Sequence, residues 1–332
     1  MPSVIEVMDA QRVALDGRVV EVMNRMTNAY GRIWVELKVE IESIAQDIAA
    51  GKDRAWLERR IRSLMRQVDD RLRVYGAYAD TTLGESVSAA VGTALTDIEQ
   101  VIAADVGERM PQQVVAIIDA QWNRLNVEAV NNMIAMTSAG SPLRSRMTEL
   151  LGESVAQAVG DKMNYAVARG WNPLRTVAEL RKTFGQGLEW SVSQVRTAQI
   201  YSYREATRAS MMANSNIVIG WQWAANLTDA RTCMSCINKN GSIHPIDEPL
   251  KDHYNGRCRM RPLTRVSDIT EIPNGEEWFK TQPVERQQAL MGSGMYEAWQ
   301  NNQFAFSDLS KTVNNDIYGD MLQAASLKEL VS

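Results

Sequence analysis

Apolar residues recur at spacings of three and four along most of the first 215 positions. This period is that of an amphipathic helix, with one apolar face and polar residues opposite. It predicts a helix over 4–49, a break at Gly51-Lys52-Asp53, and a second helix capped by Asp53. We therefore expect residues 1–185 to form an elongated helical region.

Prolines mark further helix starts, because the first helical residue needs no backbone donor. Three prolines each stand where a new apolar period begins: Pro111, Pro142 and Pro173. Ser141 and Asn172 precede two of them and are suited to cap the helices. A turn is predicted at Gly185-Gln186-Gly187, followed by a long helix from Trp190 to about Asn214.

The pattern changes after this long helix. Residues 217–223 are mostly β-branched or aromatic with partial alternation, which predicts a short strand. The next forty or so residues carry no helical period, and helical signals return near Pro283 and over 291–301. The predicted fold is mainly α: the helical N-terminal region, a small α+β module with a metal-stapled loop over 186–265, and a helical tail over 266–332.

Length and composition limit the class of protein. The chain of 332 residues is long enough for about two domains, and 45% hydrophobic residues predict a real core. A formal net charge of −4 argues against a protein that coats nucleic acid along its whole length. The first residues show no secretion signal, and no run approaches the roughly 20 apolar residues that cross a bilayer. We expect folding in a reducing cytosol and no membrane partner.

The three cysteines and two histidines of the chain all lie between positions 233 and 258. An odd number of thiols in a reducing compartment argues against a disulfide framework and for metal binding or reactivity. The spacing is C-x2-C-x16-H-x4-C, in which a close pair of thiols bends around one cation and later ligands complete a tetrahedron. It predicts a structural zinc ion, because thiolate and imidazole ligands favour zinc over hard cations.

The predicted zinc ligands are Cys233, Cys236, His253 and Cys258, with His244 as the alternative histidine. Four protein ligands leave no open position for water, so the ion is expected to crosslink the loop and not to catalyse a reaction. In the competing interpretation the cysteines are small buried hydrophobic residues and His253 caps a loop. Against that interpretation, a loop without a helix of its own needs a crosslink to hold one shape.

Four arginines lie beside or after the last ligand: Arg257, Arg259, Arg261 and Arg265. Guanidinium groups bind phosphates and carboxylates through paired hydrogen bonds, so the cluster suits a nucleic acid or an acidic partner surface. A solvated rim of the module explains the same residues equally well. Trp221 and Trp223 are expected to pack the module against the helices and not to stack on bases.

Motifs run through residues 190–265 in a recognisable order. They are Arg196-Thr197, Gly220-Trp221-x-Trp223, Asp229-x-Arg231-Thr232-Cys233, Cys236, Asn240-Gly241, Pro249, His253 and Cys258-Arg259. The stretches Glu277-Trp278-Phe279 and Ser326-Leu327-Lys328-Glu329-Leu330 continue the pattern in the tail. Together, their order and spacing resemble the phage Mu F-like head morphogenesis family, also called minor head proteins. The first 185 residues carry no motif that matches this family.

The chain departs from this family at one ligand position. The family often has His-Pro-x-Cys-Arg-Cys, whereas the string here is His253-Tyr-Asn-Gly256-Arg-Cys258. Gly256 stands where the family has its first cysteine, so a single sulfur follows the histidine. The resemblance therefore implies a Cys3His set without a fourth cysteine.

The resemblance implies a structural component of a tailed-phage or prophage virion, located in the phage head and assembled in the cytoplasm of the bacterial host. Proteins of this family are present in few copies at the portal vertex and support head assembly, DNA packaging or ejection. The implied partners are the portal protein and the major capsid or scaffold proteins, with non-specific contact to packaged DNA.

Two other functions would also use a zinc site. A zinc-supported nuclease would need a catalytic histidine and metal-binding carboxylates besides the zinc ligands, and only His244 is left over, without a paired acidic motif. A DNA-binding regulator would need a basic recognition helix, whereas the helix predicted over 190–214 is mixed in charge. The residues therefore disfavour both functions. The resemblance implies an assembly protein that is not an enzyme, with residues 1–185 as its docking or assembly part.

Overall fold

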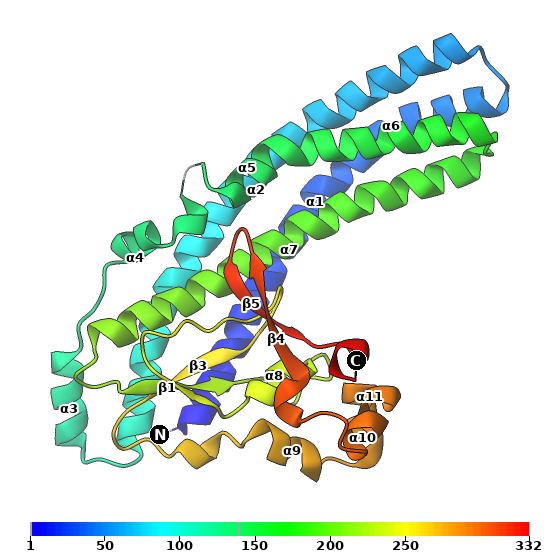
Figure 1. The fold of residues 1–332 in the computed structure, drawn as a ribbon. Helices are drawn as coiled ribbons and strands as arrows, with labels where there is room; N and C mark the ends of the chain where they lie inside the picture. The colour runs from blue at the N-terminus through cyan, green and yellow to red at the C-terminus, as the bar shows by residue number, and fades with distance from the viewer. Residues whose placement is uncertain (1, 139, 332) are drawn as a thin grey trace. The chain divides into compact units, whose positions relative to one another are not determined.

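The computed structural model describes residues 2–138 and 140–331. Long N-terminal helices are followed by a small strand-containing region, as the sequence predicts (Figure 1). The chain forms two compact units. The first unit comprises Met1–Asp16, Ser88–Ile134 and Ile200–Ser332, and the second comprises Gly17–Val87 and Ala135–Gln199.

These two units differ from the three consecutive parts that the sequence predicts, 1–185, 186–265 and 266–332. Residues 88–134, which lie within the predicted N-terminal region, belong to the same unit as residues 200–265 of the predicted module and the predicted tail, whereas residues 186–199 of the module belong to the second unit. The reason is the length of the helices. A helix rises about 1.5 Å per residue, so the 54 residues of α2 (Arg54–Gly107) extend through both units.

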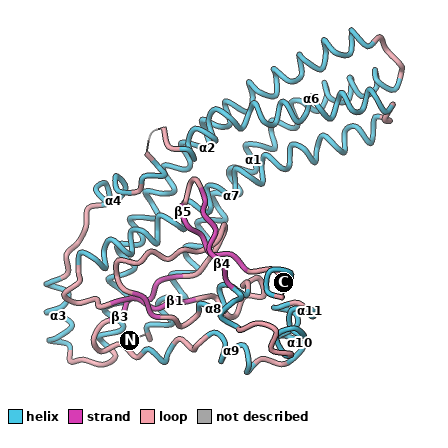
Figure 2. Tube along the Cα trace, in the orientation of Figure 1, coloured by secondary structure: helices cyan, strands magenta, loops and turns pink. Residues whose placement is uncertain are grey.

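The second unit is built from long helical segments that run beside one another (Figure 2). Helix α1 (Val4–Ala49) ends and α2 begins where the sequence predicts a break, and the Trp56 N–H donates to Asp53 Oδ2 at 3.0 Å. The other elements are η1 (Ala135–Thr137), α5 (Pro142–Ser145), the π-helical turn η2 (Arg146–Leu150), α6 (Leu151–Arg169) and α7 (Pro173–Ala213), which ends in the first unit.

The predicted helix starts at prolines are confirmed. Helices α5 and α7 begin at Pro142 and Pro173. Asn172 accepts the Arg175 N–H at 2.9 Å, and Ser141 caps α5 in the same way. In the first unit, Pro111 stands one residue before α3 (Gln112–Gln121), and α4 (Val127–Met133) follows.

The predicted turn at residues 185–187 is wrong, because α7 continues through it. Gly187 permits a close approach of helices. A Cβ atom at this position would lie 2.6 Å from the Tyr30 hydroxyl and 2.7 Å from Val155 Cγ2. A Cβ atom at Gly185 would have no other atom within 4 Å, so packing does not require a glycine at that position. Two glycines therefore resemble a turn signal, although one of them serves helix packing.

The first unit contains a three-stranded antiparallel sheet in the order β2-β1-β3. The strands are β1 (Gly220–Ala224), β2 (Ile243–His244) and β3 (Arg259–Leu263), and the short helix α8 (Met234–Lys239) lies between β1 and β2 in the chain. Strand β1 confirms the predicted strand, although its ladder begins only at Gly220. Its Trp221 pairs with His244 of β2 and with Pro262 of β3.

The tail is not entirely helical, which corrects the prediction for residues 266–332. Helices α9 (Gly275–Thr281), α10 (Val284–Met291) and α11 (Ser293–Gln300) come first, after η3 (Ile269–Glu271). Then η4 (Phe306–Leu309) leads into a hairpin of β4 (Ser310–Asn315) and β5 (Gly319–Ala324), and α12 (Leu327–Leu330) follows. The turn uses Gly319 at φ +70°, a conformation that glycine favours. The asparagine and aspartate residues at positions 314–316 are the sequence signal that could have predicted this turn.

The core around the sheet contains both strand tryptophans. Trp221 is fully buried and Trp223 nearly so, together with Ile102 of α2 and with Cys236 and Cys258. This confirms the expectation that the tryptophans pack the module against the helices. A second core joins α8 to the helices of the tail. Among the helices of the described residues, none is long and apolar enough to span a bilayer.

We predict opposite effects for two glycine substitutions in α7. Gly187→Ala should destabilise the second unit by about 1–3 kcal/mol, because the added methyl group overpacks against Tyr30 and Val155. Gly185→Ala is the matched control and should stabilise the unit by up to about 1 kcal/mol through its higher helix propensity. Urea unfolding followed by circular dichroism measures both. Equal effects would contradict the close approach at Gly187.

Candidate metal centre

Two predicted ligands come from the start of α8. Cys233 is the N-cap of this helix and Cys236 lies in its first turn. Residues three apart on a helix share a face, so the two sulfur atoms point to the same side. Cys236 is buried, and Cys233 is partly exposed.

The other two ligands come from the segment that leads into β3. Cys258 immediately precedes this strand, and His253 lies five residues earlier. Between them the chain turns sharply: Asn255 has φ +58°, and the Gly256 N–H donates to the His253 carbonyl oxygen at 2.9 Å. This turn directs both ligands towards α8.

His253 presents one ring nitrogen to the cysteines. Its Nε2 lies 3.1 Å from Cys233 Sγ and 3.4 Å from Cys236 Sγ. Its Nδ1 lies 2.8 Å from the Tyr254 carbonyl oxygen. A carbonyl only accepts, so Nδ1 carries a proton. This bond fixes the orientation of the ring, as is usual for histidine ligands of metals.

The sulfur of Cys258 joins the cluster through Cys236. Cys233, Cys236 and His253 form one group of donor atoms within 4.8 Å of one another, and Cys236, Asp252 and Cys258 form a second. The structure thus brings the four predicted ligands together as a Cys3His cluster that could hold a metal ion. Asp252 was not predicted, because an aspartate beside a histidine in a loop is too common to be a signal.

The pKa values differ among the three thiols. Cys236 and His253 lower the pKa of Cys233 to about 4, and Cys233 in turn raises the pKa of His253 to about 9. The neighbouring sulfurs raise the pKa of Cys236, and burial raises that of Cys258. One sulfur is therefore a thiolate beside an imidazolium. A bound cation would displace the protons of the other two thiols and the Nε2 proton of His253, because thiolates and neutral imidazole are the metal-binding forms.

His244, the alternative ligand, lies outside the cluster. Its ring stacks on Trp221 with 4.2 Å between ring centroids. Its Nε2 is 2.8 Å from Ser242 Oγ, and its Nδ1 is 3.1 Å from Glu248 Oε1. Both ring nitrogens thus have partners other than the cysteines. Within the described residues, His253 is the histidine of the metal-binding groups.

Two of the four clustered arginines, Arg259 and Arg261, are buried, so for these two neither a phosphate or partner contact nor a solvated rim fits. Arg261 is fully buried, and its Nη2 lies 2.6 Å from Glu271 Oε2 and 3.3 Å from Asp105 Oδ1. Arg259 donates to the carbonyl oxygens of Met8 and Gln11 at 3.3 and 3.0 Å. These guanidinium groups neutralise and bridge groups of the protein itself.

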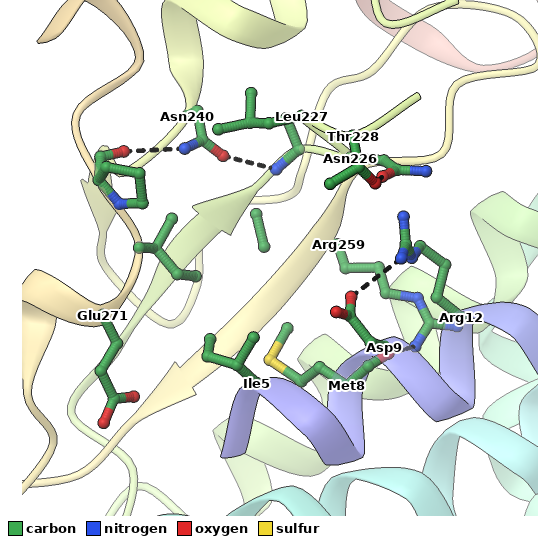
Figure 3. Close-up of a pocket in the computed structure, with 14 residues that line it drawn as sticks. Ile5, Met8, Asp9, Arg12, Asn226, Leu227, Thr228, Asn240, Arg259 and Glu271 are labelled. Carbon is green, nitrogen blue, oxygen red and sulfur yellow. Dashed lines mark hydrogen bonds and ion pairs between the residues drawn. The ribbon is translucent and has the colours of Figure 1, made fainter. Parts of the chain in front are cut away.

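Figure 3 shows Arg259 beside the first turns of α1, in the wall of a cavity of about 180 Å³. Across this cavity, Asn240 bridges two loops: its Oδ1 accepts the Ala225 N–H and its Nδ2 donates to the Pro273 carbonyl oxygen, both at 2.8 Å. Gly241 beside it has φ +82°, and a Cβ there would lie 2.6 Å from the Pro273 oxygen. The Asn-Gly pair therefore holds the loop after α8.

Arg257 and Arg265 differ from the buried pair. Arg257 forms an ion pair with Asp229, which also accepts the Arg231 backbone N–H at 2.9 Å. These arginines lower the pKa of Asp229. The pair links the loop before Cys233 to the loop that carries Cys258, so Arg257 already has an internal partner. Arg265 is exposed and remains available to a partner or to solvent.

Comparison of the chain with models of protein families, with curated protein sequences and with solved structures finds no match.

We predict that Arg261→Gln destabilises the first unit by about 1–3 kcal/mol, because it removes the fully buried partner of Asp105 and Glu271, which keep only Arg109 as an ion-pair partner among the described residues. Arg265→Gln is the matched control and should change the unfolding free energy by no more than about 0.5 kcal/mol. Urea unfolding followed by tryptophan fluorescence measures both. If Arg261→Gln left the unfolding free energy unchanged, the ion pairs of Arg261 would not stabilise the fold.

Proposed function

We propose that this chain is a minor head protein of a tailed phage or prophage, which acts in head morphogenesis at the portal vertex and in DNA packaging or ejection. In this proposal the Cys3His cluster holds a structural zinc ion. The portal protein and the major capsid or scaffold proteins are the partners. The proposal rests on the Mu F-like motifs of residues 190–265 and on what their side chains do in the folded module.

The observation that carries the proposal is that these motif residues act together around one metal centre. The tryptophans of Gly220-Trp221-x-Trp223 fill the core beside Cys236 and Cys258. Asp229 links the two ligand-bearing loops through Arg257. Asn240-Gly241 holds the loop that follows α8. Motifs that match by chance would have no reason to share one structural role.

The donor set supports zinc as the ion. Three sulfurs and one imidazole nitrogen are soft or borderline ligands, which favour zinc over magnesium or calcium. Four protein ligands would complete a tetrahedral zinc site and leave no position for a reacting water. When bound, the ion would crosslink the start of α8 to the segment before β3. This chemistry suits an assembly protein better than a hydrolase.

We predict that the purified protein carries about one equivalent of zinc, which the double substitution Cys233→Ser, Cys258→Ser abolishes. His244→Ala is the matched control and should retain the zinc, because His244 bonds to Ser242 and Glu248 instead. Elemental analysis after dialysis measures the zinc content. A metal-free wild-type protein that folds normally would refute the structural zinc.

We predict that the chain co-purifies with the portal protein of the same phage when the two are expressed together. The portal protein of an unrelated phage is the control and should not be retained. Cryo-electron microscopy of assembling heads should then find the chain at the portal vertex. Its absence from assembling heads would refute the proposed function, even if the zinc site were present.

A separate assay distinguishes an enzyme from an assembly protein. The chain is incubated with DNA in the presence of magnesium or manganese, and the proposal expects no cleavage above that of the His244→Ala variant. Robust cleavage that is lost on His244→Ala would favour a zinc-supported nuclease instead. This result would overturn the structural role while leaving the zinc site intact.

A further inference from the structure

Asp252 is a buried carboxylate inside the proposed zinc centre that the Cys3His set does not use. Its side chain is fully buried. Its Oδ1 lies 3.5 Å from both Cys236 Sγ and His253 Nε2, which is close enough for Asp252 to compete as a ligand. A buried carboxylate at this distance from two ligands must either bind the ion or shape the site around it.

The hydrogen bonds of Asp252 favour the second role. Its Oδ2 receives Arg204 Nη2 at 2.6 Å and the Cys258 N–H at 3.3 Å. Its Oδ1 receives the His253 N–H at 2.8 Å. Both carboxylate oxygens therefore have donors from the protein, and two of these donors are the backbone amides of ligands.

Arg204 completes the arrangement from α7. Besides its ion pair with Asp252, its Nε donates to the Cys258 carbonyl oxygen at 2.9 Å and its Nη2 donates to the Gly256 carbonyl oxygen at 3.0 Å. One guanidinium group thus binds the turn at three points. Its side chain is nearly buried, with 7% exposed, so solvent does not weaken the pair.

The Asp252 carboxylate packs closely against the backbone of Gly256. A Cβ atom at this position would lie 2.1–2.5 Å from the three atoms of the Asp252 carboxyl group. The carboxylate thus occupies the space that any side chain at position 256 would need. The glycine at position 256 and the aspartate at position 252 are mutually dependent.

The charge balance of the site also disfavours Asp252 as a ligand. Three thiolates around a divalent cation already leave one negative charge, and a bound carboxylate would add another in a buried site. The ion pair with Arg204 compensates the charge of Asp252 without the metal. The carboxylate can therefore remain beside the ion without binding it.

We propose that Asp252 is a positioning residue of the metal centre: held by Arg204, it shapes residues 252–258 so that His253 and Cys258 face Cys233 and Cys236. This inference deepens the structural zinc of the proposed function and rests on it. It requires neither the portal partner nor a position in the virion.

The first test is the zinc affinity of the full chain carrying Asp252→Asn, measured by competition with a chromophoric chelator. We expect zinc to bind roughly 10- to 100-fold more weakly, as is typical when a group that orients metal ligands is lost. Asp320→Asn is the matched control, because Asp320 pairs with Lys251 beside the same loop but at the surface. This variant should bind zinc as the wild type does.

X-ray absorption spectroscopy at the zinc edge separates positioning from ligation. The wild type and Asp252→Asn should both show three sulfur and one nitrogen neighbours, since the oxygens of Asp252 are held by Arg204 and by the backbone amides of His253 and Cys258. An oxygen neighbour in the wild type that Asp252→Asn removes would overturn the proposal. The wild-type spectrum decides this point even if the variant does not fold.

A second variant tests the dependence between positions 252 and 256. Gly256→Ala should weaken zinc binding to a similar degree, because its methyl group displaces the Asp252 carboxylate. The two losses should be far from additive in the double variant, since each disrupts the same arrangement. Gly294→Ala is the control, because a Cβ there meets only Leu327 Cδ2 at 3.5 Å.

The outcomes are distinct. Unchanged zinc affinity in both Asp252→Asn and Gly256→Ala overturns the positioning role and leaves the structural zinc intact. A wild-type chain that binds no zinc overturns both the positioning role of Asp252 and the structural zinc. Loss of portal binding has no bearing on either result, so failure of the virion role is recognised separately.

Discussion

The buried ion pair between Arg204 and Asp252 is the interaction on which the metal-ligand segment depends. Residues 252–258 contain no helix or strand, so their backbone polar groups need partners from elsewhere. Arg204, on the long helix α7, supplies such partners to the carbonyl oxygens of Gly256 and Cys258. Together with the ion pair to Asp252, these bonds attach the loop to α7. A buried pair is stable only with such additional hydrogen bonds.

The same principle explains the arginines of β3. Arg259 binds carbonyl oxygens of α1 and lies 4.8 Å from the centre of the Tyr203 ring, while Arg261 pairs with acidic residues of α2 and η3. Each side chain connects the strand to a segment that is distant in the sequence, Arg259 by hydrogen bonds and Arg261 by ion pairs. Cys258 immediately precedes this strand, so these ties also restrict the position of the last ligand. A cluster of arginines in a sequence can therefore serve the fold and not a partner.

The proposed role in a phage head is consistent with a centre of this kind. A closed set of four ligands and a network of buried ion pairs hold one geometry, which an assembly protein needs for a stable docking surface. The motif residues described above stabilise the module through internal contacts. The proposal therefore assigns to the metal centre the maintenance of a shape, and to surfaces outside it the contact with partners.

The sequence by itself determined the elements that depend on local patterns. Helical periods, proline starts and the cap at Asp53 require only neighbouring residues. The spacing of the cysteines and of His253 predicted which residues form the Cys3His cluster. Tertiary structure alone decided the rest. Position 187 within α7 suits a glycine because Tyr30 packs closely against it. Arg261 is buried where it pairs with Asp105, and Asp252 lies beside the cluster where it pairs with Arg204. Each partner is far away in the chain, and no local pattern records such a distance.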